Sequence, residues 1–394
     1  MKFTVARSMM ARALALSRRA AGKRTILAPI DMVLLNVNGN GKLELVTTDL
    51  EIALCCHIPV TVQESGSTAS PVGLLADLVK AFDDEKITAE LSDINQVLSL
   101  HCGRDKAQVH GVPAQNFPIV PAPEGEATAF IAPDVLRRMI NQVVFAASAD
   151  ESRPALTGVL LQAQGTKLTM VAADGYRLSR VIATVDNDLP EIDMIVPLRA
   201  IKELRQLTSV TSAPVALYVT SASEDNKRII FHVTNGEGKF QGITEIDLVT
   251  KAIAGPYPNY HPLIPTSWTT KAEINVADLI SALRPLRALV RAGMVPSVTL
   301  SIQEGSVVFS GYVQSSYCSV EENSDQGKAK VDAVTQGEQQ AVILNSNYLW
   351  DALQSMKDVE RVAIEVTTSS RPVVLKPQGD DDCLHLIMPM GPTS

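Results

Sequence analysis

The chain has 394 residues, of which 46% are hydrophobic and 20% are charged, and its formal net charge is −8. This length predicts several domains, and the composition excludes a disordered chain, because disorder requires fewer apolar and more charged residues. The apolar runs are shorter than the roughly 20 residues that span a bilayer, and arginines interrupt the N-terminal segment. We therefore expect a cytoplasmic globular protein with no membrane association.

The five cysteines are odd in number and scattered along the chain. They lack the paired spacing of zinc ligands and do not form a disulfide framework. We expect free thiols that are mostly buried.

One pattern recurs six times along the chain: a short strand, an amphipathic helix and about three further strands. The copies begin near residues 1, 68, 127, 193, 272 and 340. In each copy the strand leads into a stretch with helical apolar spacing, such as Leu349, Leu353 and Met356, which share one helix face. The sequence therefore predicts six β-α-β-β-β units. Pro285 lies inside the fifth helix, and we expect it to kink or split that helix.

A single unit leaves the edges of its small sheet open, so two units are expected to pair into one domain. Six units then make three similar α+β domains. Proline-rich connectors at 117–127 and 253–268 mark the joins. The predicted domains are residues 1–122, 123–254 and 255–394.

The positive charge is concentrated in four of the six helices. These segments carry +10 together, which leaves −18 for the rest of the chain. The segments are 8–24, 133–146, 198–208 and 277–292. Ordinary solvated helix faces are one interpretation. A surface that meets the phosphate backbone of duplex DNA without reading bases is the other, and the low aromatic content of 4% argues against single-strand stacking.

No motif of an enzyme active site is present in the sequence. The six histidines are dispersed and none lies in a metal-binding or triad-like motif. The segment 379–385 could be a metal site of a hydrolase, formed by Asp380, Asp381, Asp382 and His385, but a solvated turn before a last strand is the favoured interpretation. We predict no catalytic residue, no metal and no cofactor.

Several blocks of the sequence resemble one family. They are "MKFTV" at the start, "LVTTDLEI" (45–52), "NFPIVP" (116–121), "FAASADESRPALTGVLL" (145–161), "LTMVAADGYRLS" (168–179), "YPNYHPLIP" (257–265) and "LIMPM" (386–390). Over its full length the chain is similar to the bacterial DNA polymerase III beta subunits, the beta sliding clamps.

The resemblance implies a DNA clamp fold of three double-unit domains and a head-to-tail homodimer closed into a ring. Such a ring encircles duplex DNA without sequence specificity and tethers the replicative DNA polymerase catalytic subunit for processivity. A clamp loader opens the ring, and other replication and repair proteins bind it through short peptides. A divergent second clamp copy with altered partner choice is the alternative within this class.

The resemblance also implies three sets of site residues. The peptide cleft would comprise Leu156, Gly175, Tyr176, Arg177, Leu178, Pro258, Leu263, Asn347, Leu386, Ile387, Met388, Pro389 and Met390. The DNA-binding set, taken from the basic helices and from this resemblance, is Lys23, Arg24, Arg137, Arg138, Arg153, Arg199, Lys202, Arg205, Arg284 and Arg287. The dimer interface would include Leu78, Phe82, Leu289 and Val290.

Overall fold

The computed structural model describes residues 1–22, 29–92, 94–221, 227–234, 241–290, 296–314 and 324–391. The chain forms two compact units. The first comprises Met1–Arg137, Val185–Pro190 and Val196–Ala254, and the second comprises Arg138–Thr184, Glu191–Ile195 and Gly255–Ser394.

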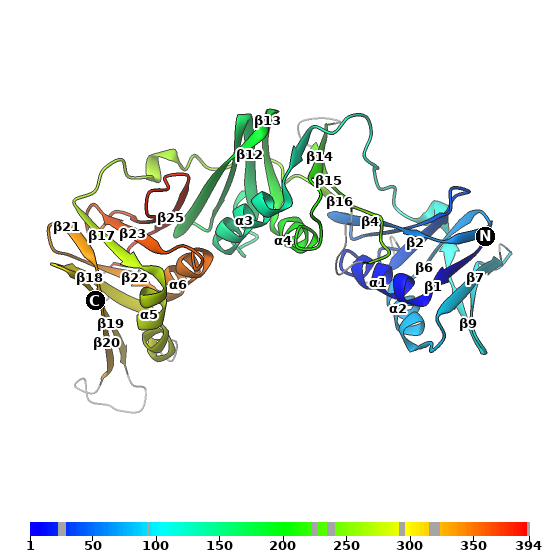
Figure 1. The fold of residues 1–394 in the computed structure, drawn as a ribbon, viewed down its shortest axis with the longest axis horizontal. Coiled ribbons are helices and arrows are strands. Elements are labelled where there is room, and N and C mark those ends of the chain that lie inside the picture. Colours follow the sequence, from blue (N-terminus) through cyan, green and yellow to red (C-terminus); the bar gives the residue numbers. More distant parts are fainter. Residues whose placement is uncertain are drawn as a thin grey trace. The chain divides into compact units, whose positions relative to one another are not determined.

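Six α-helices are present among the described residues, one in each predicted unit of the repeat (Figure 1). They are α1 (Arg7–Ser17), α2 (Val72–Ala81), α3 (Pro133–Val143), α4 (Leu198–Leu207), α5 (Val276–Val290) and α6 (Ser346–Ser355). Each helix follows a strand directly or after one residue. The predicted strand-to-helix pattern is confirmed. No helix among the described residues is long and apolar enough to cross a membrane.

The first unit contains two antiparallel sheets, with the orders β5-β1-β7-β8-β9 and β10-β6-β2-β3-β4-β16-β15-β14-β11. Helix α1 packs on β3 and β4, and α4 packs on β16. The strands are β1 (Lys2–Ala6), β2 (Met32–Val37), β3 (Lys42–Thr48), β4 (Ile52–Pro59), β5 (Thr61–Glu64), β6 (Gly66–Pro71), β7 (Lys86–Ser92), β8 (Val97–Cys102), β9 (Asp105–His110), β10 (Val112–Pro113), β11 (Ala129–Ile131), β14 (Val215–Ser221), β15 (Lys227–Thr234) and β16 (Glu245–Lys251).

The second unit contains two further antiparallel sheets, with the orders β12-β13-β25-β24-β23-β17-β21 and β20-β19-β18-β22. Helices α5 and α6 enclose one core with these sheets, in which Leu283 and Leu353 pack with Phe309. The strands are β12 (Gly158–Ala173), β13 (Arg177–Pro197), β17 (Thr270–Asn275), β18 (Ser297–Gln303), β19 (Ser306–Gln314), β20 (Ser324–Asp332), β21 (Val334–Gly337), β22 (Gln340–Asn345), β23 (Arg361–Val366), β24 (Val373–Pro377) and β25 (Cys383–Ile387).

Both units join strands from different predicted domains edge to edge. In the first unit β4 pairs with β16, and in the second β13 pairs with β25. In each case a strand that follows the first helix of one domain meets the last strand that follows the second helix of the next. The backbone ladder therefore continues from one domain into the next.

The structure corrects two predictions about helix ends. The basic segment 8–24 is not one helix, because α1 ends at Ser17 and the Arg18 N–H closes its last turn on the Leu14 carbonyl. Helix α5 is not split at Pro285, since it runs unbroken to Val290. Proline removes one helical donor, and both Pro285 and Ser281, the residue whose carbonyl loses its partner, are exposed to solvent.

We predict that Gly337→Ala destabilises the second unit by more than about 2 kcal/mol. Gly337 has a φ of +90° and pairs with Thr270 at the edge of the sheet, where an added Cβ would overlap the Thr269 carbonyl oxygen. The midpoint of thermal unfolding measures the loss. Gly39→Ala is the control, because Gly39 lies in open space. An equal midpoint for the two variants would contradict the prediction.

Candidate functional site

A tight turn joins β12 to β13 at Asp174 and Gly175. One carboxylate oxygen of Asp174 accepts hydrogen bonds from the backbone N–H groups of Tyr176 (2.9 Å) and Arg177 (3.0 Å). Gly175 has a φ of +94°, in the left-handed region that glycine adopts without a Cβ penalty. The predicted turn is confirmed, and it leaves the Tyr176 side chain 64% exposed.

The segment after β25 runs along this turn. The Met388 N–H donates to the Tyr176 carbonyl (2.8 Å), and the Met390 N–H donates to the carbonyl of Ile343 on β22 (2.8 Å). The C-terminal segment is therefore held on both sides by the backbone. The predicted last strand before Met388 is confirmed as β25.

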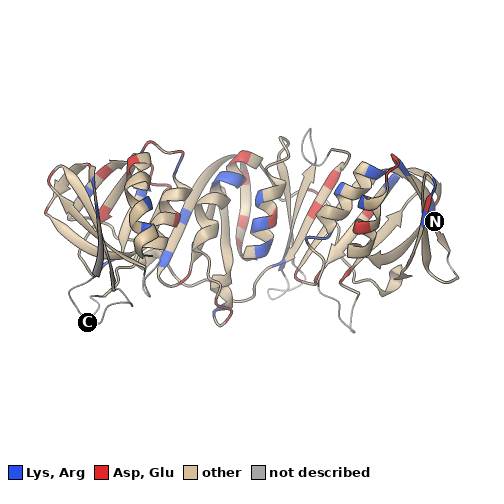
Figure 2. Cartoon of the chain, turned by 90° about the horizontal axis from the view of Figure 1, so that it is seen from below, with Lys and Arg blue, Asp and Glu red and all other residues tan. Residues whose placement is uncertain are grey.

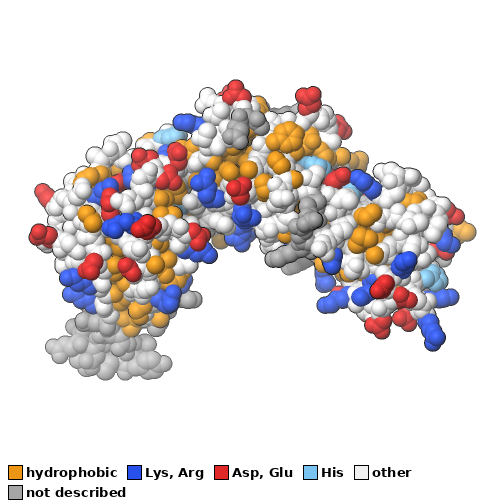
Figure 3. All heavy atoms as spheres, in the orientation of Figure 1, with side chains coloured by type: hydrophobic (Ala, Val, Ile, Leu, Met, Phe, Trp, Pro, Cys, Tyr) orange, Lys and Arg blue, Asp and Glu red, His pale blue; other side chains and the backbone are white. Residues whose placement is uncertain are grey.

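Several members of the predicted cleft set have apolar side chains at the surface. Met388 is 37% exposed, and Leu263, at the end of a short 3-10 helix, is 50% exposed. Pro258 is also exposed, whereas Pro389 and Met390 are half-buried. Figure 3 shows hydrophobic side chains at the surface among charged ones. Exposed apolar side chains rimmed by polar groups are typical of a peptide-binding surface.

Four residues of the predicted cleft set are buried inside the second unit. Leu178 and Leu386 face each other across the β13–β25 ladder, and Ile387 is opposite Arg177. Leu156 is buried in the short helix before β12. These apolar side chains form the packed support of the cleft and do not contribute to its exposed surface.

The Arg177 guanidinium contacts four side chains. It donates to the carboxylates of Asp174 (2.9 Å) and Asp351 (2.8 Å). Its central carbon lies 4.4 Å from the ring centre of Tyr348 and 5.5 Å from that of Phe145. Two charge-assisted hydrogen bonds and two cation–π contacts hold the side chain in one position. Arg177 therefore ties β13 to α6.

Sequence reasoning missed the three partners Phe145, Tyr348 and Asp351. The available signal was the spacing of Tyr348 and Asp351, which lie three residues apart on one face of α6. Burial raises the pKa of the Tyr348 hydroxyl, which keeps this ring neutral beside the guanidinium. Nothing in the spacing says which basic residue this face would meet.

Two residues of the predicted DNA-binding set lie beside cleft residues. A Cβ placed on Gly175 would lie 3.0 Å from the Arg153 guanidinium, so Arg153 borders the turn. The Arg287 guanidinium donates to the Asn347 side-chain oxygen (3.4 Å) and lies 4.7 Å from the ring centre of Trp350. The two predicted sets therefore meet in the second unit.

Two arginines of the predicted DNA-binding set are engaged within the first unit. Arg137 donates to the Thr208 carbonyl just after α4 (3.1 Å). Arg199 forms an ion pair with Asp49 and donates to the Arg19 carbonyl (2.9 Å). Both side chains therefore already have protein partners.

Other basic residues of the set extend into solvent from the helices, where Figure 2 colours several Lys and Arg positions. The exposed members are Arg138, Lys202, Arg205 and Arg284. None of these four forms an ion pair within the described part of the chain. Lys23 and Arg24 lie outside the described residues.

The predicted dimer-interface residues have different degrees of exposure. Leu78 and Leu289 are half-buried, and Phe82 is buried. The Val290 side chain lies outside the described part of the structure. Leu78 and Leu289 are therefore the members with apolar surface left for a partner.

The structure separates the four residues of the hydrolase alternative. Asp380, Asp381 and Asp382 belong to a turn in which the Asp382 N–H donates to the Asp380 carboxylate (2.8 Å). His385 is buried, between the hydroxyls of Ser179 (2.7 Å) and Ser355 (3.1 Å). The described residues contain no group of three His, Cys, Asp or Glu side chains that could hold a metal ion. The metal-site hypothesis is therefore not supported.

The duplicated strand–helix architecture, with sheets continued across domain joins, defines the class of DNA clamp folds. Three family models match this chain. They describe the N-terminal domain (residues 1–121), the central domain (130–259) and the C-terminal domain (261–391) of the DNA polymerase III beta subunit.

Relatives and solved structures agree with this match over the full length. The beta sliding clamp of Streptococcus pneumoniae is 26% identical over 398 residues, which cover 98% of each chain, and that of Streptomyces coelicolor is 27% identical over 401 residues, which cover 99% of each. The crystal structure of the DNA polymerase sliding clamp from Bacillus subtilis has a TM-score of 0.88 at 22% identity and covers 100% of both chains. The chain belongs to the DNA polymerase III beta subunit family, and its function is that of a DNA sliding clamp.

We predict that His385 lowers the stability of the protein as the pH falls. Burial lowers the pKa of His385 to about 3, well below its ordinary value of 6.5. The unfolded chain therefore binds a proton below pH 6.5 that the folded chain does not. The stability that neutral His385 contributes is fully present above pH 6.5. The free energy of unfolding then falls between pH 6.5 and about 3, by up to about 1.4 kcal/mol per pH unit.

Nuclear magnetic resonance of the imidazole carbons measures this pKa, and urea unfolding at several pH values measures the stability. His385→Gln keeps a polar side chain and should have a shallower loss of stability between pH 6.5 and pH 4.5. An imidazole that titrates near pH 6.5 in the folded protein would contradict the prediction.

Proposed function

We propose that two copies of this chain close head to tail into a ring that encircles duplex DNA without sequence specificity. The observation that carries the proposal is the repeated strand pairing of β4 with β16 and of β13 with β25. The next pairing in this series joins β20 of the third domain to β9 of the first domain of a second copy. Within the described strands, β20 pairs only with β19, and β9 pairs only with β8.

The two free edges support this closure physically. An unpaired edge strand exposes a row of backbone N–H and C=O groups that can pair with another chain. One contact of β20 with β9 of a second copy leaves one β9 and one β20 edge free at the two ends of the pair. A twofold axis brings these two edges together in a second, identical contact, so that no edge stays free. Leu78 and Leu289, on α2 and α5, would add apolar burial beside the new ladder. At the join inside the first unit, Arg19, just after α1, forms an ion pair with Glu203 on α4.

The basic helices support contact with DNA. In the closed ring the exposed arginines and lysines of α3, α4 and α5 face the duplex and meet phosphates without reading bases. The closed ring would stay on DNA because it is topologically linked to the duplex, and not because it binds the duplex tightly. No catalytic step is assigned to the chain, which would act as a processivity factor in the cytoplasm.

The cleft supports docking of short peptides. Its occupants would be segments of the replicative DNA polymerase catalytic subunit, of the clamp loader and of other replication and repair proteins. The apolar side chains of Tyr176, Leu263 and Met388 would provide the contact area. Arg153 lies at the rim beside Gly175, where it suits an acidic group of the peptide.

The decisive experiment loads the protein with a clamp loader onto closed circular DNA and then cuts the circle. We expect retention on the closed circle in high salt and rapid loss from the linear product, because only the free ends release a linked ring. Gel filtration of the DNA after each step measures the bound protein. Equal loss from both forms would exclude topological linkage.

We predict that Met388→Asp lowers the affinity for a polymerase-derived peptide by about tenfold or more, since a charge replaces an exposed apolar anchor. The dimer should stay intact, because Met388 lies apart from β9 and β20 in the sheet order. Fluorescence anisotropy of the labelled peptide measures binding. The matched control is Val334→Asp, which changes another apolar side chain of the third domain that is 54% exposed. An unchanged affinity of the Met388 variant would overturn the cleft assignment.

A further inference from the structure

The join between the first and central domains repeats the turn of the peptide cleft, bond for bond. One oxygen of the Asp49 carboxylate accepts hydrogen bonds from the backbone N–H groups of Glu51 (3.0 Å) and Ile52 (2.9 Å). Asp174, two units later in the sixfold repeat, accepts the equivalent pair of bonds from Tyr176 and Arg177. The Asp49 N–H donates to the Ile52 carbonyl at 3.2 Å, the same length as the bond from Asp174 to Arg177. Leu50 has a φ of +80°, and it occupies the position of Gly175.

The strand that ends beside each turn is also equivalent. Thr250 on β16 is opposite Ile52, just as Ile387 on β25 is opposite Arg177. The next residue, Lys251, donates its N–H to the Glu51 carbonyl (3.2 Å). Met388 makes the equivalent bond in the cleft. Lys251 therefore occupies the backbone position that Met388 has in the cleft.

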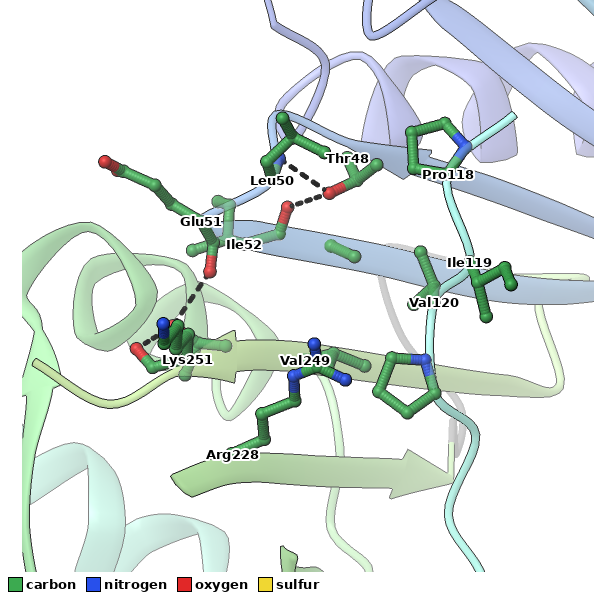
Figure 4. Close-up of a pocket in the computed structure, with 13 residues that line it drawn as sticks. Thr48, Leu50, Glu51, Ile52, Pro118, Ile119, Val120, Arg228, Val249 and Lys251 are labelled. Carbon is green, nitrogen blue, oxygen red and sulfur yellow. Dashed lines mark hydrogen bonds between the residues drawn. The ribbon is translucent and has the colours of Figure 1, made fainter. Parts of the chain in front are cut away.

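A pocket of about 120 Å³ lies at this join, and we call it the joint pocket (Figure 4). Its walls come from the turn after β3, from β15 and β16, and from the connector at 118–121 that follows the first domain. The connector joins the first predicted domain to the second, as residues 253–268 join the second to the third. Ile119, between prolines of this connector, is 96% exposed, and Leu50 is 62% exposed.

Leu50 has a backbone conformation that is costly for a residue with a Cβ. The Thr48 hydroxyl accepts from the Leu50 N–H (2.9 Å) and donates to the Ile52 carbonyl (2.8 Å), which holds the turn in place. Figure 4 shows these two bonds at the rim of the pocket. The structure therefore maintains a strained turn that presents an apolar side chain to solvent.

Two cations stand at the opposite side of the joint pocket. Arg228 on β15 is directly opposite Lys251 on β16, and both line the pocket. Like charges that face each other across neighbouring strands are unfavourable. Neither side chain forms an ion pair within the described residues. An anionic group placed between them would remove this repulsion.

We propose that the joint pocket is a second docking site, which binds a short, extended, acidic segment of a partner protein that carries one apolar side chain. The apolar side chain enters between Leu50 and Ile119, and acidic groups meet Arg228 and Lys251. The pocket volume of about 120 Å³ suits one side chain and not a whole small molecule, because small-molecule sites have about 300 to 1,000 Å³. The cleft presents Met388 at the equivalent position, so the two sites differ in the charge of the peptide that they select.

The test uses the full-length protein and the labelled peptide acetyl-Glu-Asp-Leu-Asp-Glu-amide. Methyl resonances of Ile119 and Leu50 should shift on titration, whereas the methyl groups of Met388 and Met390 should not. Arg228→Glu combined with Lys251→Glu should weaken binding by about tenfold or more, with fluorescence anisotropy as the measurement. Raising the salt concentration should weaken binding as well.

Matched controls separate this site from general charge effects and from the cleft. Arg371→Glu reverses an exposed cation in the turn before β24 and should bind the peptide as the unmodified protein does. A peptide with lysine in place of each acid should not bind. The proposal is overturned by shifts confined to Met388 and Met390, by equal binding of the lysine peptide, or by an unchanged affinity of the double variant. Absence of binding at about 1 mM peptide, or shifts of Ile119 with duplex DNA alone, would also overturn it.

Discussion

Edge-to-edge pairing of antiparallel strands is the constraint on which this structure depends. Each small domain would otherwise leave the backbone donors and acceptors of its outer strands unpaired. Unpaired groups that are buried cost free energy, and unpaired groups that stay exposed to solvent favour aggregation. Pairing β4 with β16 and β13 with β25 satisfies these groups at both joins. It also sets the register of the turns that precede β4 and β13. The pairing of strands thus positions both the cleft and the joint pocket.

The two joins show how one backbone frame serves different chemistry. The carboxylates of Asp49 and Asp174 fix the same turn, and Lys251 and Met388 make the same backbone bond beside it. The two turns differ in the side chains that they present, since Leu50 of the first turn stands where the second has Gly175. Their second carboxylate oxygens also differ, because Asp49 pairs with Arg199 whereas Asp174 pairs with Arg177. Specificity therefore lies in a few side chains on a repeated scaffold.

Much of the fold could be predicted from the sequence because local patterns determine it. Strands that lead into helices, and the Asp174–Gly175 turn, have short-range signals that the structure confirms. Interactions between distant residues had no such signal. Two partners of Arg177, Tyr348 and Asp351, lie on α6, about 170 residues further along the chain. Helix α1 ends at Ser17, before the end of the basic segment 8–24 that the sequence assigns to it.

The site residues divide in the same way. Exposed apolar residues such as Met388 could be placed from the resemblance, since the strand before them fixes their position. The burial of Leu386 and Ile387 could not be separated from cleft exposure, because alternation along β25 is masked by burial on both faces of the sheet. The resemblance assigns Arg153 to DNA binding, and the structure places its guanidinium beside Gly175 of the predicted cleft set.

The cleft combines a rigid frame with adaptable contact groups. Arg177 is fixed by two carboxylates and two rings, and His385 on β25 is held by two hydroxyls, so little of this frame would need to be ordered on peptide binding. A preorganised frame reduces the entropic cost of association. Met388, in contrast, has an unbranched and polarizable side chain that adjusts to different partners. Because the backbone bond from Met388 to Tyr176 fixes only the base of that side chain, the proposed cleft would accommodate varied peptides while the register of its wall stays constant.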